Sequence, residues 1–222
     1  MKRWPMIAGV LGAGALLFGH DVISTKITWS REISRLVYAR CVSCHRAGGA
    51  AFSLETWSAA RPWAKAIKEE VLARRMPPWG AVKGYGEFSG DISLSQEEMD
   101  TIAQWVEGGA PEGDTALLPK SAAVAGPCFG PPPAGRRIAV NGETRLNGDS
   151  EVLAIRPSAD VGPSARVTAR LPDGSENPML WAYEYRRAFA HSFVYKEPVR
   201  LPAGTVIRSE PPIPFELRVA LR

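Results

Sequence analysis

The pentad Cys41-Val42-Ser43-Cys44-His45 constrains this chain more than any other feature. A Cys-x-x-Cys-His motif is typical of the covalent attachment site of a c-type haem. Cysteines at this spacing lie on one face of a helical turn, so both thiols can form thioether bonds with the haem vinyl groups. The adjacent imidazole then binds the iron as proximal ligand. The motif predicts one covalently bound haem c, held by Cys41, Cys44 and His45.

A zinc site or a thioredoxin-like redox pair would also use a Cys-x-x-Cys motif. Structural zinc needs about four ligands, and the chain offers only Cys128, His20 and His191 besides the pentad. A thioredoxin-like pair follows a strand in a βαβ unit, whereas this motif follows a helical pattern. Haem attachment is therefore favoured, and Cys128 is expected to be a small buried hydrophobe.

The N-terminus has the pattern of a targeting segment. Lys2 and Arg3 precede an apolar run from Met6 to Phe18, which is typical of a secretory signal. The run is shorter than the roughly 20 residues that a membrane span needs, and no A-x-A cleavage site follows it. Residues 1–25 are therefore predicted to be a signal peptide or an N-terminal membrane anchor. Either one places the remaining chain in the periplasm, free or anchored to the inner membrane.

Composition and charge narrow the classes of partner. The formal net charge is +4 and the sequence pI is about 9.1, and 45% of the residues are hydrophobic. This composition supports a packed core. The mild positive charge is compatible with an acidic protein partner or an anionic membrane face. Because Lys and Arg are scattered along the chain, nucleic-acid binding has little support.

Residues 26–118 have helical patterns. A helix capped by Ser30 is expected to lead into the haem motif, and another is expected to begin near Pro62 and end before Met76. A third should begin at the capping box formed by Ser95 and Glu98. These helices predict an all-α domain.

The pattern changes after that domain. Residues 119–136 are rich in Pro, Ala and Gly and are expected to be a linker. Residues 137–222 are expected to form short strands, at 137–140, 143–146, 151–156, 165–171, 183–195, 199–201 and 215–221. The predicted fold class is thus α+β and multidomain: an all-α domain followed by an antiparallel β-sandwich.

The sixth iron ligand is predicted to be Met76. It lies in a loop made rigid by Pro77 and Pro78, and a thioether ligand raises the haem potential. Met99 is the alternative, although its place on the inner stripe of a helix favours a core role. Trp79 is expected to contact the haem, and the pocket is also expected to be walled by Trp57, Trp63 and Trp105.

Segments within residues 27–114 resemble short class I cytochrome c domains. The matching motifs are Cys41–His45, Ala60–Lys65, Arg75–Trp79 and Trp105–Asp114. This resemblance implies that Met76 is the axial ligand, and that such a domain is fused to another module.

The second half is similar, more weakly, to the C-terminal β-sandwich of peptidylglycine-type copper monooxygenases. The resemblance rests on segments 168–175, 180–181, 195–198 and 201–205. That family's copper site uses a His-x-His pair and a Met, but the corresponding stretch, 156–160, has no histidine. Copper monooxygenase activity is therefore not expected. Met179 is not expected to bind copper, and His191 is expected to be structural.

These features together predict an electron carrier rather than an enzyme. The expected function is single-electron transfer between a donor and an acceptor redox protein, including a membrane-bound respiratory or photosynthetic complex. Two alternatives stay open: a structural haem subunit of a larger membrane redox complex, and a haem enzyme or sensor with a labile distal ligand.

Overall fold

A computed structural model describes residues 26–120 and 127–221. The predicted targeting segment 1–25 and part of the predicted linker lie outside these ranges. No helix within them is long and apolar enough to cross a membrane.

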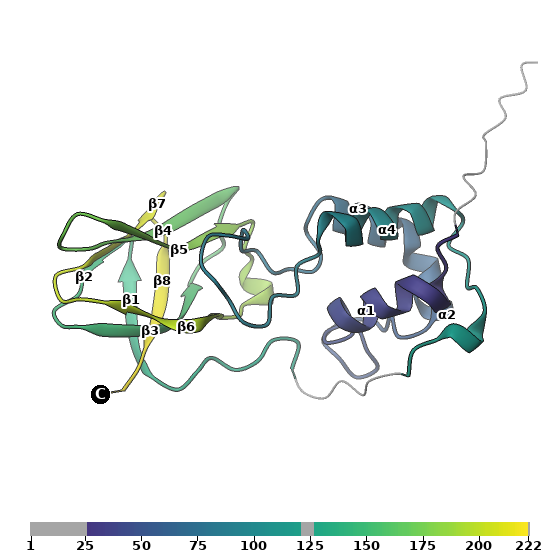
Figure 1. The fold of residues 1–222 in the computed structure, drawn as a ribbon, viewed down its shortest axis with the longest axis horizontal. Helices are drawn as coiled ribbons and strands as arrows, with labels where there is room; N and C mark the ends of the chain where they lie inside the picture. Colours follow the sequence, from purple (N-terminus) through teal and green to yellow (C-terminus); the bar gives the residue numbers. More distant parts are fainter. Residues whose placement is uncertain (1–25, 121–126, 222) are drawn as a thin grey trace, which may run out of the picture.

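Short helices gather at one end of the molecule in Figure 1. They are the π-helical turn η1 (Trp29–Ile33), α1 (Ser34–Arg40), α2 (Trp57–Ala60), the 3₁₀ turn η2 (Arg61–Trp63), α3 (Ala64–Leu72), α4 (Gln96–Glu107) and η3 (Thr115–Leu117). The capping box of Ser95 and Glu98 at α4 is confirmed, and Pro62 lies in a first turn as predicted.

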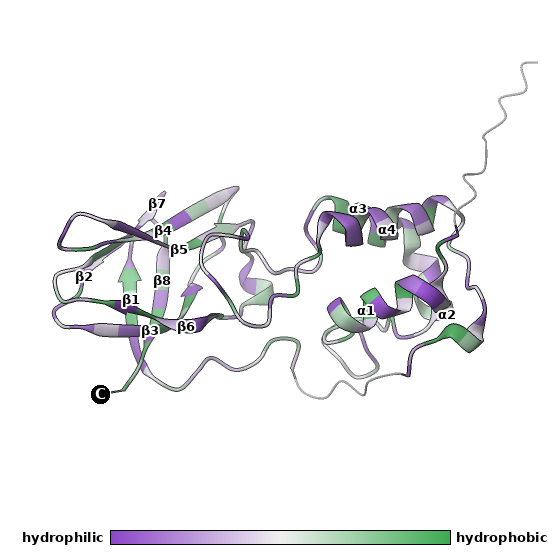
Figure 2. Cartoon of the chain, in the orientation of Figure 1, coloured by the Kyte–Doolittle hydropathy of each residue, from purple (hydrophilic) through white to green (hydrophobic). Residues whose placement is uncertain are grey.

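The predicted cap at Ser30 is wrong. Thr28 is the N-cap of the first turn, whereas Ser30 is fully buried and its hydroxyl donates to the backbone oxygen of Glu112 at 2.8 Å. Ser30 therefore ties the start of the helical half to its end. The neighbouring core is centred on Trp29 and Trp105, whose ring centroids lie 6.0 Å apart. In Figure 2 the helices carry both hydrophobic and hydrophilic colours, as expected of helices with one buried face.

The second half is built from antiparallel strands. They are β1 (Arg136–Asn141), β2 (Glu143–Arg145), β3 (Ser150–Pro157), β4 (Ser164–Arg170), β5 (Glu176–Tyr183), β6 (Phe193–Leu201), β7 (Val206–Glu210) and β8 (Pro214–Val219). Their hydrogen-bonded order is β5-β4-β7-β2-β1-β8-β3-β6. Because β1 and β2 share the single register pair Asn141 and Glu143, the strands fall into two sheets of four. Both sheets contribute to one apolar core.

The strand prediction was correct in part. Strands near 137–140, 143–146, 151–156, 165–171 and 215–221 are confirmed as β1, β2, β3, β4 and β8. The predicted strand 183–195 is wrong, because β5 ends at Tyr183 and a 3₁₀ turn, η4 (Arg187–Phe189), intervenes before β6. The predicted strand 199–201 is confirmed as the end of β6, whereas β5 and β7 were not predicted.

The predicted fold class, an all-α domain followed by a β-sandwich, is also wrong. The described helices are short, the longest being the 12 residues of α4, and strands hold more of the described residues than α-helices do. The first half is not purely helical, since its segment 79–92 forms bridges from Ala81 to Ala182 and from Phe88 to Tyr195. The chain is mostly β, and segment 79–92 packs into the core of the strands.

Candidate functional site

An apolar cavity of about 420 Å³ lies where the pentad, α3 and the Met76 loop meet. This volume is in the range typical of small-molecule and cofactor pockets. Its lining includes all four residues predicted to hold the haem: Cys41, Cys44, His45 and Met76. The fold therefore brings together His45 and Met76, which are 31 positions apart in the sequence.

The pentad lies in a helix-like turn that continues from α1. The Cys41 amide donates to Val37 O at 2.8 Å, and the amides of Cys44 and His45 both donate to Cys41 O, at 3.1 and 2.9 Å. This turn places both cysteines and the histidine along the same cavity wall. The local geometry is the one that the spacing of the motif predicts.

His45 is held in one orientation by the backbone. Its Nδ1 lies 3.0 Å from Phe52 O, and because a carbonyl oxygen can only accept, Nδ1 carries the hydrogen. The Phe52 ring also packs against the imidazole edge, at 4.9 Å between centroids. The lone pair of Nε2 is then available for a metal. This backbone contact is the usual way in which a metal-binding histidine is oriented.

Met76 is positioned by the C-terminal end of α3. The amides of Arg75 and Met76 both donate to Glu70 O, at 2.9 and 3.2 Å. The Arg75 guanidinium also forms two 2.8 Å hydrogen bonds with the Glu70 carboxylate. These bonds hold the Glu70 pKa below its usual value. The start of the loop is therefore fastened to the helix immediately before the predicted ligand.

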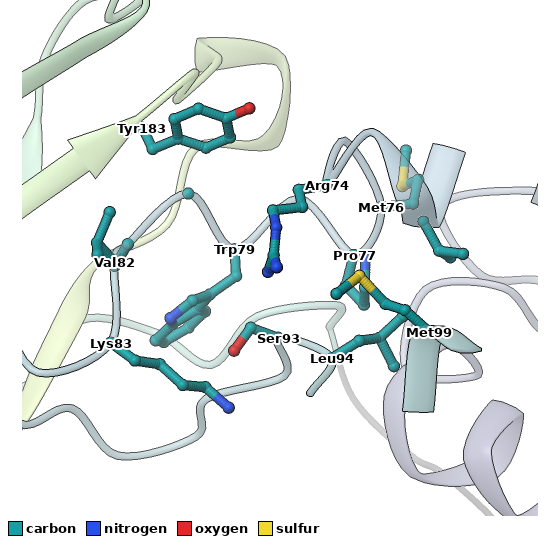
Figure 3. Close-up of a pocket in the computed structure, with 13 residues that line it drawn as sticks. Arg74, Met76, Pro77, Trp79, Val82, Lys83, Ser93, Leu94, Met99 and Tyr183 are labelled. Atoms are coloured by element: carbon teal, nitrogen blue, oxygen red, sulfur yellow. The ribbon is translucent and has the colours of Figure 1, made fainter. Parts of the chain in front are cut away.

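Met99 lies elsewhere. It is 2% exposed within the helical core and lines a second cavity of about 450 Å³. Figure 3 shows this second cavity, with Met76, Pro77 and Met99 on the helical side and Tyr183 on the strand side. Met76 borders both cavities, whereas Met99 belongs to the second. The geometry thus favours Met76 over Met99 as a ligand in the first cavity.

Trp79 does not lie where the sequence analysis placed it. It is 4% exposed and belongs to the strand core, stacked on His191 at 5.2 Å and edge-on to Phe193 at 5.2 Å. The chain turns away from the helices after Pro78, and the Tyr183 amide donates to Gly80 O at 2.9 Å. Pairing with β5 therefore carries Trp79 out of the first cavity.

Of the three other tryptophans expected around the haem, one lines the first cavity and two do not. Trp63 lines the first cavity, as predicted. Trp57 and Trp105 instead donate their indole hydrogens to Ala110 O and Pro111 O, at 2.9 and 3.0 Å. These two bonds hold the end of the helical half in place. Neither tryptophan is part of the lining of the first cavity, which therefore has fewer tryptophans than expected.

The position of Cys128 differs from the sequence-based expectation of a small buried hydrophobe. Cys128 is not an isolated buried thiol but forms a disulfide with Cys44 and lines the first cavity. Cys41 is the free thiol. Although Cys41 is only partly buried as a residue, desolvation of its thiol raises the pKa to about 12, with opposing contributions from Arg40, which lowers it, and Glu98, which raises it.

His191 lies in the strand half at 4% exposure. Its ring stacks between Phe129, at 4.0 Å, and Trp79, at 5.2 Å. Its Nδ1 lies 2.9 Å from Phe189 O, and desolvation by burial lowers its pKa. Within the ranges that the structure describes, no three His, Cys, Asp or Glu side chains gather around a point where a metal ion could bind.

The donor set of the first cavity suits a c-type haem. The Cys41 thiol, the Cys44 sulfur, one oriented imidazole and one thioether line a single apolar space, and these residue types are the ones that attach and ligate such a haem. The disulfide at Cys44 is the one conflict, because a sulfur in a disulfide cannot also form a thioether. No protein-family model, curated protein or solved structure matches the chain.

Proposed function

We propose that this chain is a monohaem c-type cytochrome that passes single electrons between redox proteins. The observation that carries the proposal is the meeting of Cys41, Cys44, His45 and Met76 in one apolar cavity. A bound haem would supply an iron that cycles between the ferrous and ferric states.

Each of these side chains has a distinct task. Cys41 and Cys44 would fix the haem covalently, and His45 would bind the iron through Nε2 while Phe52 O holds the ring. Met76 would bind the iron through its thioether sulfur, which favours the ferrous state. The lining contributes a single imidazole, His45, so general acid–base chemistry by a second histidine is not part of the proposal.

The mouth of the cavity supports outer-sphere electron transfer. Phe52, Trp63 and Phe189 line the cavity and are 47%, 47% and 39% exposed. Large apolar side chains at a solvent-facing rim are a suitable contact for a transient protein partner. We propose periplasmic redox proteins as donor and acceptor, with the strand half serving as a docking or assembly module.

Carbon monoxide binding tests the function. The full chain is produced together with a c-type haem attachment system, and haem that stays on the chain in a denaturing gel shows covalent attachment. The reduced protein should then show no spectral change with carbon monoxide, because the Met76 thioether would already bind the iron. Met76→Ala should bind carbon monoxide, whereas the matched control Met99→Leu should behave as the parent.

Two results would contradict the proposal. Absence of covalent haem in the parent chain would remove the cytochrome assignment. Prompt carbon monoxide binding by the parent would show an open or labile distal position, and the haem enzyme or sensor alternative would replace electron transfer.

A further inference from the structure

Cys44 and Cys128 come together over a long stretch of chain. They are 84 residues apart in the sequence, and their Cα atoms lie 4.5 Å apart, within the range of roughly 4.4–6.8 Å that disulfides span. Both line the cavity that holds the other predicted haem ligands. The third cysteine of the chain is therefore part of the candidate site.

Contacts other than the disulfide also place Cys128 there. The next residue, Phe129, stacks on the buried His191 ring at 4.0 Å. His191 in turn contacts Phe189 O through Nδ1, and Phe189 lines the same cavity. The strand half thus holds the segment around Cys128 against the haem motif, so the pairing does not depend on the sulfur–sulfur bond alone.

We propose that Cys128 is a redox partner of the haem-attachment motif: it holds Cys44 as a disulfide in the haem-free chain and releases it for thioether formation. This inference rests on the proposed function. One sulfur cannot keep both bonds, so the disulfide must open first. A dithiol reductant gives two electrons and two protons, forming two thiols and becoming a disulfide itself. The Cys44 thiol then adds across a haem vinyl group, sulfur to one carbon and hydrogen to the other, with no further change of oxidation state.

The redox state of Cys128 should differ between the haem-free chain and the haem-loaded protein. After attachment at Cys44, Cys128 is a free thiol beside the cofactor. Its reactivity toward an alkylating reagent therefore reports which of the two states the chain is in.

Peptide mapping tests the pairing directly. The haem-free full chain is oxidised in air, digested with trypsin without reduction and analysed by mass spectrometry. Cleavage after Arg40, Arg46, Lys120 and Arg136 gives peptides 41–46 and 121–136. We expect them joined through Cys44 and separated by dithiothreitol. In haem-loaded protein, Cys128 should instead be alkylated by N-ethylmaleimide.

A Cys41→Ser background isolates the fate of Cys44, because it removes the competing pair within the motif. Oxidised Cys41→Ser should attach haem only after dithiothreitol treatment, with complete loss of attachment otherwise. Adding Cys128→Ser in the same background should remove the need for the dithiol.

The outcomes separate the two proposals. If peptide 121–136 carries a free thiol in the oxidised haem-free chain, or if oxidised Cys41→Ser attaches haem without a dithiol, the role of Cys128 is overturned. If reduced Cys41→Ser and the reduced parent both fail to attach haem while the linked peptides are found, the haem function fails and the pairing stands as a structural disulfide.

Discussion

Glu98→Gln should destabilise the helical half by about 2 kcal/mol, the value expected for hydrogen bonds to a charged group. Glu98 Oε2 accepts from the Ser95 amide at 2.7 Å, and Oε1 accepts from Arg40 Nε and Nη2 at 3.1 and 3.0 Å. The side chains of Glu98 and Arg40 are 19% and 30% exposed, so water screens this ion pair only in part. Because Arg40 directly precedes Cys41, the Glu98 carboxylate also holds in place the start of the Cys41–His45 pentad.

The expected loss for Glu98→Gln depends on which hydrogen bonds a glutamine at this position can still accept. Its carbonyl oxygen can still accept from one of these donors, but the charge and the second acceptor oxygen are lost. Glu97→Gln is the matched control, since Glu97 lies in the same first turn of α4 and is exposed. It removes only a favourable interaction with the helix dipole, which contributes about 0.3–1 kcal/mol.

Urea unfolding of the haem-free chain, followed by tryptophan fluorescence, measures both variants. The free energy of unfolding should fall for Glu98→Gln by at least about 1 kcal/mol more than for Glu97→Gln. Equal values for the two variants would show that the contacts of Glu98 with Ser95 and Arg40 contribute no more than an exposed charge does, and would contradict a stabilising role for their partial burial.

The same carboxylate gives a pH dependence. Desolvation raises the Glu98 pKa, but hydrogen bonds from Ser95 and Arg40 outweigh it, so the net shift is downward. A carboxyl whose folded pKa is depressed stabilises the protein above its unfolded pKa of about 4.3, and this contribution is lost as the pH falls through the folded value. The stability difference between the parent and Glu98→Gln should therefore be full at pH 6 and shrink as the pH falls below about 4.

Three further substitutions test the packing of the strand half, all by urea unfolding of the haem-free chain. Gly86→Ala should lower the free energy of unfolding by about 1–3 kcal/mol more than Gly84→Ala does. Both glycines have positive φ, so the backbone strain is similar in the two variants. A Cβ at Gly86 would lie 2.6 Å from Met179 O, whereas one at Gly84 would meet nothing within 4 Å. Equal losses would argue against close packing of segment 79–92 on β5. Tyr195→Phe should cost about 1–2 kcal/mol, because the buried hydroxyl donates to Met179 O at 2.9 Å; an unchanged midpoint would count against that bond. Cys128→Ser should lower stability by up to about 4.5 kcal/mol under oxidising conditions, since the disulfide closes a long loop, and the difference from the parent should vanish in dithiothreitol.

Local signals in the sequence predicted the positions of neighbouring residues better than they predicted the fold. The spacing of Cys41, Cys44 and His45 sets their positions on one turn, and that turn lines the cavity as expected. The capping box of Ser95 and Glu98 was also predictable, because both partners are close in sequence. Such features depend on contacts within a few residues.

Long-range pairing was not predictable in this way. Segment 79–92 is rich in glycine and resembles a surface loop, and only its bridges to β5 and β6 reveal that it is part of the strand core. Trp79 was assigned to the wrong cavity for this reason. Strand β5 was missed because Pro178 weakens the strand pattern, and Cys128 was missed because nothing local indicates a partner 84 residues away.

Each half of the chain contributes residues that pack with the other half, and this has a consequence for proteolysis. Segment 79–92, which precedes Lys120, is embedded in the core of the strands, while Cys128 and Phe189, which follow it, line the cavity beside the helices. A single cut after Lys120 therefore leaves two fragments that stay associated, through buried side chains even when the disulfide is reduced. The nicked protein should behave as a fragment-complementation pair, in which the strand fragment loses Trp79 and Phe88 from its core when the other fragment is removed.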